Sequence, residues 1–177
     1  MILDFNLQFT GTVGSPNQSP TTGTQTSTNI IDLHMAGIPV LANLQGARDI
    51  GIGDQPALKI VCWVTIAFTG GTSMQINLQG ATDNGSGAPA AFSTWWSSPV
   101  YAEATLVAGA RLYDMDMPRP PAGIAVPRFL QLQYVTVGTH GAGALSSWIV
   151  IDRMDQMYQS TTNQTLGGYP AGVTVAN

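Results

Sequence analysis

Two aspartates, Asp114 and Asp116, are the closest pair of groups in the sequence that could perform acid–base chemistry. They lie two residues apart in an expected strand, so their carboxylates would project from one face about 7 Å apart. That separation suits a general acid–base pair or two calcium ligands, and an enzymatic function would rest on this pair alone. The favoured interpretation is a solvated strand face beside the apolar phase of Tyr113, Met115 and Met117.

The two histidines, His34 and His140, lie far apart in expected loops. A metalloenzyme on a β-scaffold needs a cluster of His and carboxylate ligands, which two isolated imidazoles do not provide. No G-x-S-x-G motif presents a serine nucleophile. The glycines Gly138, Gly141 and Gly143 are not followed by the Lys-Ser or Lys-Thr of a phosphate-binding loop. We therefore predict no catalytic residues, no metal site and no cofactor.

Five aromatic residues could form a sugar-stacking surface, although core and subunit-interface positions are commoner for such side chains. Two of them, Trp95 and Trp96, are adjacent in sequence, and adjacent strand residues point to opposite faces. Both could enter one core only if the backbone bends, so one of the pair is a candidate contact residue. The five are Trp63, Trp95, Trp96, Tyr101 and Trp148.

The composition predicts one domain with a sparsely charged surface. The chain has 177 residues, of which 44% are hydrophobic and 9% are charged, against a usual charged share of about 25%. Such a surface favours an obligate assembly over a free monomer, although Gln, Asn, Ser and Thr can also solvate a monomer. With a net charge of −4 and six scattered Lys and Arg residues, no basic patch is available to bind nucleic acid.

The remaining global features indicate a soluble protein. Cys62 is the sole cysteine, which excludes an internal disulfide, and its apolar surroundings predict a buried thiol. The first residues, MILDFNLQF, have an acid where a signal peptide would carry Lys or Arg. No apolar run approaches the 18 residues of a membrane-spanning helix. We therefore expect neither a secretion signal nor a membrane partner.

A hairpin over residues 58–82 is the strongest structural prediction. Apolar residues occupy every second position of both arms, as in half-buried strands, and Gly70 and Gly71 suit a tight turn between them. The first arm also carries apolar residues in its other phase, which indicates a strand covered on both sides. We expect a neighbouring subunit or an arm of the chain to pack on that second face, which bears Val61, Trp63 and Ala67.

About eight short strands without an amphipathic helix predict a single all-β domain over residues 1–153. The expected architecture is a jelly-roll or related Greek-key β-sandwich with extended polar arms, of undetermined strand order. The arms are a flexible Thr-, Ser-, Gly- and Pro-rich loop, an insertion and a polar C-terminal extension without periodicity, at 10–28, 34–46 and 154–177. Besides the hairpin, strands are expected at 2–9, 29–33, 100–106, 111–117, 128–137 and 145–153.

An ordered series of motifs resembles a known family. The chain is similar over roughly 29–152 to the jelly-roll capsid cement, or decoration, proteins of tailed bacteriophages, of the type first described in a Bordetella phage. Each motif alone is a weak signal, and their order carries the specificity. Around the central hairpin the motifs are TNIIDL (28–33), GARDIGIGD (46–54), TLVAGARL (105–112), RFLQLQYVTVG (128–138) and LSSWIVID (145–152).

The resemblance implies a structural protein without catalytic activity. It implies a homotrimer on the outer surface of a virion head, made in the host cytoplasm, which bridges neighbouring subunits of the major capsid protein. The segments 10–28, 34–46 and 154–177 depart from the shorter family pattern, and could be arms that reach adjacent capsomers. The alternative, motivated by the tryptophans, is a glycan- or receptor-binding jelly-roll module on a virion fibre or tail. The candidate interface residues are Trp63, Trp95, Trp96 and Tyr101, with Arg48 and Asp49 of the RDIG motif.

Overall fold

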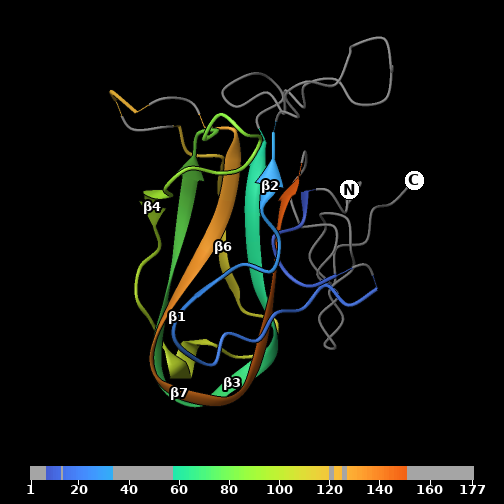
Figure 1. The fold of residues 1–177 in the computed structure, drawn as a ribbon. Helices are drawn as coiled ribbons and strands as arrows, with labels where there is room; N and C mark the ends of the chain where they lie inside the picture. Colours follow the sequence, from blue (N-terminus) through green and yellow to red (C-terminus); the bar gives the residue numbers. More distant parts are fainter. Residues whose placement is uncertain (1–6, 13, 34–57, 120–121, 125–126, 151–177) are drawn as a thin grey trace, which may run out of the picture.

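Two long strands organise the protein, as the computed structural model shows (Figure 1). The structure describes residues 7–12, 14–33, 58–119, 122–124 and 127–150. Strands β3 (Lys59–Ala81) and β7 (Phe129–Val150) are antiparallel and paired along their whole lengths. The shorter strands flank this ribbon; they are β1 (Thr22–Thr26), β2 (Ile31–Asp32), β4 (Ser93–Ser97), β5 (Tyr101–Ala102) and β6 (Arg111–Asp116).

The β3–β7 ribbon folds over on itself near its middle. The strand register is irregular in several places between Val64 and Ser73, and β-bulges of this kind bend a strand and increase its twist. Gly70 on β3 and Gly138 on β7 have positive φ angles, which a glycine adopts without strain. Figure 1 shows both strands curving round the lower end of the molecule. The two halves of one continuous sheet therefore become two layers that face each other.

Each layer is about four chain segments wide. In the first layer, β6 pairs with the first half of β3, and isolated bridges from Gln8 and Gln18 reach the far edge of β7. In the second layer, β4 and β5 pair with the second half of β3, while β1 and β2 pair with β7. The predicted all-β sandwich is confirmed, and its layers are parts of a single antiparallel sheet.

One core lies between the two layers. Both halves of β3 present alternate side chains to it, and all of these are buried. Because the two halves keep the same alternation on either side of the bend, one strand supplies both walls. Removing such a side chain from water contributes roughly 1.5–3 kcal/mol. The β3 residues in the core are Ile60, Cys62, Val64, Phe68, Met74, Ile76 and Leu78.

The predicted hairpin over 58–82 is wrong. Residues 70 and 71 lie inside the continuous strand β3, whose partner is β7 and not its own second half. The same correction applies to β7, because 128–137 and 145–153 were expected as separate strands and the structure joins them through residues 138–144. A glycine with positive φ, such as Gly70, serves a reversing turn and a bend equally well. Local sequence therefore does not distinguish them.

The shorter elements agree in part with the sequence. The strand expected at 29–33 contains β2, and the strand expected at 111–117 is β6. Segment 10–28 is not wholly a loop, since β1 lies within it. The strand expected at 100–106 ends early, because a 3-10 helix at Glu103–Thr105 follows β5. The insertion 34–46, the extension 154–177 and the beginning of the strand expected at 2–9 lie outside the described residues.

Candidate functional site

Trp95 and Trp96 both turn towards the core. In the pairing of β4 with β3, Trp96 lies opposite Leu78 and Thr94 lies opposite Gln79, so Trp95 is the extra residue of a β-bulge. Both indoles pack against the core cluster. The ring of Trp96 meets that of Tyr113 edge-on at 5.3 Å between centroids. The bend that the sequence required for this arrangement is present, and the pair does not form an exposed aromatic surface.

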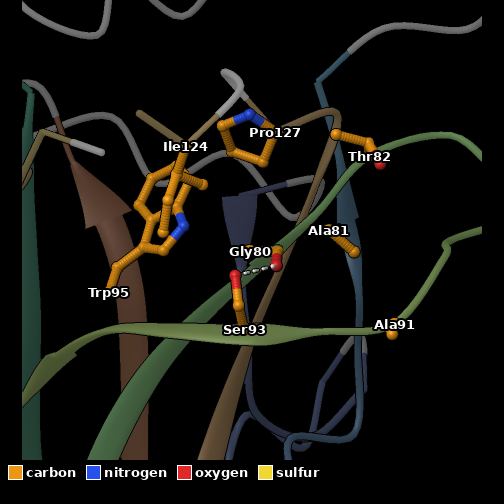
Figure 2. Close-up of a pocket in the computed structure, with 8 residues that line it drawn as sticks. All are labelled: Gly80, Ala81, Thr82, Ala91, Ser93, Trp95, Ile124 and Pro127. Atoms are coloured by element: carbon orange, nitrogen blue, oxygen red, sulfur yellow. Dashed lines mark hydrogen bonds between the residues drawn. The ribbon is translucent and has the colours of Figure 1, made fainter. Parts of the chain in front are cut away.

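Trp95 also forms one wall of a pocket at the end of the sandwich away from the bend (Figure 2). The pocket measures about 190 Å³. Its floor includes Gly80, where a Cβ atom would lie 2.6 Å from the indole ring, so the absence of a side chain makes room for Trp95. The indole Nε1 of Trp95 is buried without a hydrogen-bond partner. The other lining residues are Ala81, Thr82, Ala91, Ser93, Ile124 and Pro127.

Trp63 lies on the outer face of the first layer. It packs against a second apolar cluster, formed by Val61, Trp148 and Val150. Val61 is fully buried, and the indole Nε1 of Trp148 donates a hydrogen bond to Ser146 Oγ at 2.8 Å. The expectation that this part of β3 is covered on both faces is confirmed. The packing of another subunit or an arm on this face stays a prediction.

Tyr101 occupies the start of β5 and is half-buried. Its ring packs against the core, and its hydroxyl donates a hydrogen bond to the carbonyl of Leu112, which joins β5 to β6. Burial raises the pKa of the phenol. Arg48 and Asp49, the two candidates from the RDIG motif, lie outside the described residues.

Asp114 and Asp116 share one face of β6, as predicted, but each carboxylate has its own cation. Arg111 Nη1 lies 2.8 Å from Asp114 Oδ2, and Lys59 forms an ion pair with Asp116. Among the described residues, no three His, Cys, Asp or Glu side chains gather as metal ligands would. The arrangement is that of two ion pairs on the edge strand β6.

Cys62 belongs to a buried polar trio in the first layer. Tyr113 Oη lies 3.0 Å from Ser147 Oγ, and Ser147 Oγ donates to the carbonyl of Val61 at 2.8 Å. Burial raises the pKa of the Cys62 thiol to about 12. Since the thiolate is the reactive form of cysteine, this thiol is inert at neutral pH.

His140 has a structural position at the bend of the ribbon. The imidazole is buried and meets the ring of Phe68 edge-on at 5.1 Å between centroids. A Cβ atom on Gly71 would lie 2.2 Å from this imidazole, so a glycine is needed at that position on β3. Neither ring nitrogen has a hydrogen-bond partner.

No helix within the described ranges is long and apolar enough to cross a bilayer.

The outer face of the second layer carries a row of side-chain amides that the sequence analysis did not single out. Gln131 Nε2 donates to Gln79 Oε1 at 2.8 Å, and Asn77 Nδ2 donates to Gln133 Oε1 at 3.1 Å. These pairs lie directly opposite each other on β3 and β7. The signal in the sequence is the alternation of amides with apolar residues in both strands. Asn77, Gln79 and Gln131 are buried, so these amides hydrogen-bond to one another within the chain.

Arg128 ties three segments together at the end of the sandwich away from the bend. Its Nε and Nη2 atoms each lie 2.9 Å from the carboxylate oxygens of Asp32 on β2, and Nη1 forms an ion pair with Asp83. The backbone N–H groups of Gly85 and Gly87 donate to the carboxylate of Asp83. Together with Arg128, they lower the pKa of the Asp83 carboxyl. This ion-pair network fixes the turn after β3 against β2 and the start of β7.

A comparison with known protein families shows to which family the chain belongs. The model of the Bbp16 family matches residues 15–149. The chain belongs to the Bbp16 family. The matched range includes all of β1 to β6 and nearly all of β7, so the relationship covers the whole sandwich. The match is consistent with a Bordetella phage protein family, in agreement with the resemblance of the motifs. No curated protein sequence matches the chain.

Proposed function

We propose that this protein is a structural capsid cement, or decoration, protein of a tailed phage. In this proposal it binds the outer surface of the head and stabilises contacts between subunits of the major capsid protein. The single observation that carries the proposal is the Bbp16 family match across the whole sandwich, taken with the ordered motifs that resemble cement proteins. The virion surface is accordingly the proposed location.

The described surfaces support a binding role without catalysis. The aspartates that could have suggested an enzyme are engaged with Arg111 and Lys59, and the thiol is buried. Charged residues make up only 9% of the chain, and the core of a protein–protein interface is typically depleted of charged residues.

The protein is proposed to act as a homotrimer. Its low charge content supports assembly, and many copies with several contacts each can hold a capsid even when every single contact is modest. Light scattering on the purified protein is expected to give the mass of three chains. A monomer mass that is constant over concentration would contradict the trimer.

Rebinding to capsids tests the proposed function directly. Purified protein added to stripped, expanded heads is expected to bind at a fixed stoichiometry and to raise the temperature at which the heads rupture. The variant Arg48→Ala/Asp49→Ala is expected to bind more weakly, and Arg119→Ala, which also removes an arginine, serves as the control. A protein that folds but associates with no capsid surface would overturn the proposal.

The glycan-binding alternative has lost the observation that motivated it. It needs tryptophans exposed on a loop, and the structure packs all four against one of the two apolar clusters. A glycan array remains a simple check. Binding abolished by Trp95→Ala, in a variant with an unchanged circular dichroism spectrum, would revive this alternative.

A further inference from the structure

The loop after β3 exposes the one Asn-Gly pair of the sequence, Asn84-Gly85. An asparagine side chain lies within reach of the next main-chain nitrogen, which can attack the amide carbon and close a succinimide ring. The side chain of the following residue normally hinders this attack, and glycine has none. Because the pair is exposed, water also reaches the product. The loop therefore contains both partners of an intramolecular reaction.

The side-chain amide of Asn84 is held and polarised by Ser86. Asn84 Oδ1 accepts hydrogen bonds from the backbone N–H of Ser86 at 2.9 Å and from Ser86 Oγ at 2.6 Å. Asparagine side chains commonly fold back over the main chain in this way. Attack on the amide carbon drives negative charge onto Oδ1, and two donors already directed at this oxygen stabilise that charge, as in an oxyanion hole.

The attacking nitrogen has a proton acceptor beside it. Gly85 N–H donates to Asp83 Oδ1 at 2.7 Å, which is within the reach required of a general base. The N–H groups of Gly85 and Gly87 lower the pKa of this carboxyl, and Arg128 adds to the effect. The Asp83 carboxyl is therefore ionised at neutral pH and available to take the proton.

Contacts at both ends of the loop hold these groups in place. The backbone N–H of Asn84 donates to the carbonyl of Ala88 at 2.9 Å, and Asp83 forms a β-bridge with Pro89. The other carboxylate oxygen of Asp83, Oδ2, is in an ion pair with Arg128. Since nucleophile, base and amide are restrained together, little further conformational entropy is lost on reaching the reactive geometry.

We propose that Asn84 is a site of spontaneous deamidation promoted by the folded loop. Gly85 N bonds to Asn84 Cγ while Asp83 takes the proton of this nitrogen, and the electron pair of the C=O bond moves to Oδ1. When the C=O bond re-forms, the bond from Cγ to Nδ2 breaks, and Nδ2 leaves as ammonia with the proton held by Asp83. Water then opens the succinimide, giving its hydroxyl to a ring carbonyl carbon and its hydrogen to Gly85 N.

The reaction alters the corner of the sandwich that Arg128 secures. Opening at Cγ yields aspartate, and opening at the main-chain carbonyl yields isoaspartate, whose backbone runs through the former side chain. Either product adds a negative charge to a chain whose net charge is −4. Isoaspartate also displaces the Gly85 N–H from Asp83, the residue that links this turn to β2 through Arg128. The proposal goes beyond the capsid role, because it concerns the ageing of the protein itself.

Incubation of the folded, full-length protein at neutral pH tests the proposal. Chymotryptic cuts after Leu78 and Phe92 release residues 79–92, in which Asn84 is the sole asparagine. Mass spectrometry of this peptide is expected to show a growing fraction that carries a carboxyl in place of the amide. Fragmentation that distinguishes the two products is expected to find both aspartate and isoaspartate at this position.

Asn17 provides a control within the same molecule. It is exposed and, like Asn84, is followed two residues later by a serine. Its neighbour Gln18 carries a side chain, and the Gln18 N–H donates to the carbonyl of Leu145 at 2.9 Å. The nitrogen is therefore hindered and has no carboxylate to take its proton, so Asn17 is expected to keep its amide.

Variants of Ser86 separate the effect of the loop from the intrinsic reactivity of an Asn-Gly pair. Loss of one oxyanion donor slows an enzyme by about 10²–10³-fold, and since Ser86 is exposed, Ser86→Ala is expected to slow deamidation by about tenfold. Ser86→Thr keeps the hydroxyl and is expected to retain the wild-type rate. Wild-type protein unfolded in guanidinium chloride is expected to react more slowly than the folded protein. Equal rates for wild type and Ser86→Ala, or a faster reaction in the unfolded chain, would overturn the proposal.

Discussion

At the residue scale, two buried tyrosines differ in a single hydrogen bond. Tyr113 Oη is hydrogen-bonded to Ser147, whereas Tyr134 Oη is buried without a partner. Tyr134→Phe removes an unsatisfied group and is expected to raise the free energy of unfolding by about 1 kcal/mol, while Tyr113→Phe is expected to lower it by about the same amount. In a chain of this size each change shifts the melting temperature by about 2–4 °C, in opposite directions. Equal shifts of one sign in differential scanning calorimetry would contradict this assignment.

The thiol of Cys62 predicts a loss of stability in alkali. Its pKa is about 12 in the folded protein, against 9.0 for an ordinary thiol. Above pH 9 the unfolded chain therefore binds fewer protons than the folded one, and the free energy of unfolding falls as the pH rises. Burial also raises the pKa of Tyr113 and Tyr134, whose ordinary value is 10.0, so the tyrosines add to the loss towards pH 10, and the difference between wild type and a Cys62 variant isolates the thiol.

Urea unfolding between pH 8 and 10 measures this effect. In the wild-type protein, ionisation of the thiol is expected to lower the free energy of unfolding by up to about 1.4 kcal/mol per pH unit above pH 9. Cys62→Ala is expected to be less stable throughout but to show a flatter dependence in that window. Parallel pH profiles for the two proteins would show that the thiol ionises equally easily in the folded and unfolded chains.

At the scale of elements, two glycines of β7 near the bend provide a matched test. Gly143 has a φ of +133°, and a Cβ atom there would lie 2.2 Å from the ring of Phe68, whereas the same atom on Gly141 would meet only Thr69 O at 3.9 Å. Gly143→Ala is expected to destabilise the fold by about 1–3 kcal/mol. Gly141→Ala is expected to change stability by less than about 1 kcal/mol. Equal melting temperatures for both variants would contradict the proposed packing at the bend.

The bend also shows how far the sequence can predict the elements. Alternation located β3, β6 and β7 because a strand with one buried face repeats every second residue. It did not show that residues 58–82 form one strand, since Gly70 and Gly71 permit either a reversal or a bend, and the choice depends on pairing with β7. The orientation of Trp95 was equally undetermined, because a bulge depends on the register with β3.

At the candidate sites, the sequence names residues but does not place them relative to one another. The ion pairs of Asp114 and Asp116 require Arg111 and Lys59 to lie beside them, and the Lys59 contact arises from the pairing of β3 with β6. The pocket beside Trp95 combines residues from three separate segments, which no local pattern connects; they are Gly80, Ala81, Thr82, Ala91, Ser93, Trp95, Ile124 and Pro127. Such sites depend on tertiary pairing, whereas alternation is a property of each strand.

At the scale of the whole molecule, β3 and β7 each run through both layers of the sandwich. Each layer contains only part of β3 and part of β7. Unfolding one layer therefore disrupts strands that continue into the other layer. Most of the β3–β7 pairing joins residues far apart in sequence, and such topologies fold slowly, in milliseconds to seconds. We therefore expect a sandwich that opens as one unit.

Native-state hydrogen exchange can test this cooperativity with a matched pair of amides. Ser147 N–H in the first layer donates to Thr10 Oγ1, and Ile76 N–H in the second layer donates to Ser98 Oγ, both at 2.9 Å and both buried. Because the layers share the ribbon, both amides are expected to exchange with the same free energy, equal to that of global unfolding. The amide of Ala102 on the two-residue strand β5 should exchange faster through local opening. A gap of more than about 2 kcal/mol between the Ser147 and Ile76 amides would show that one layer opens while the other stays folded.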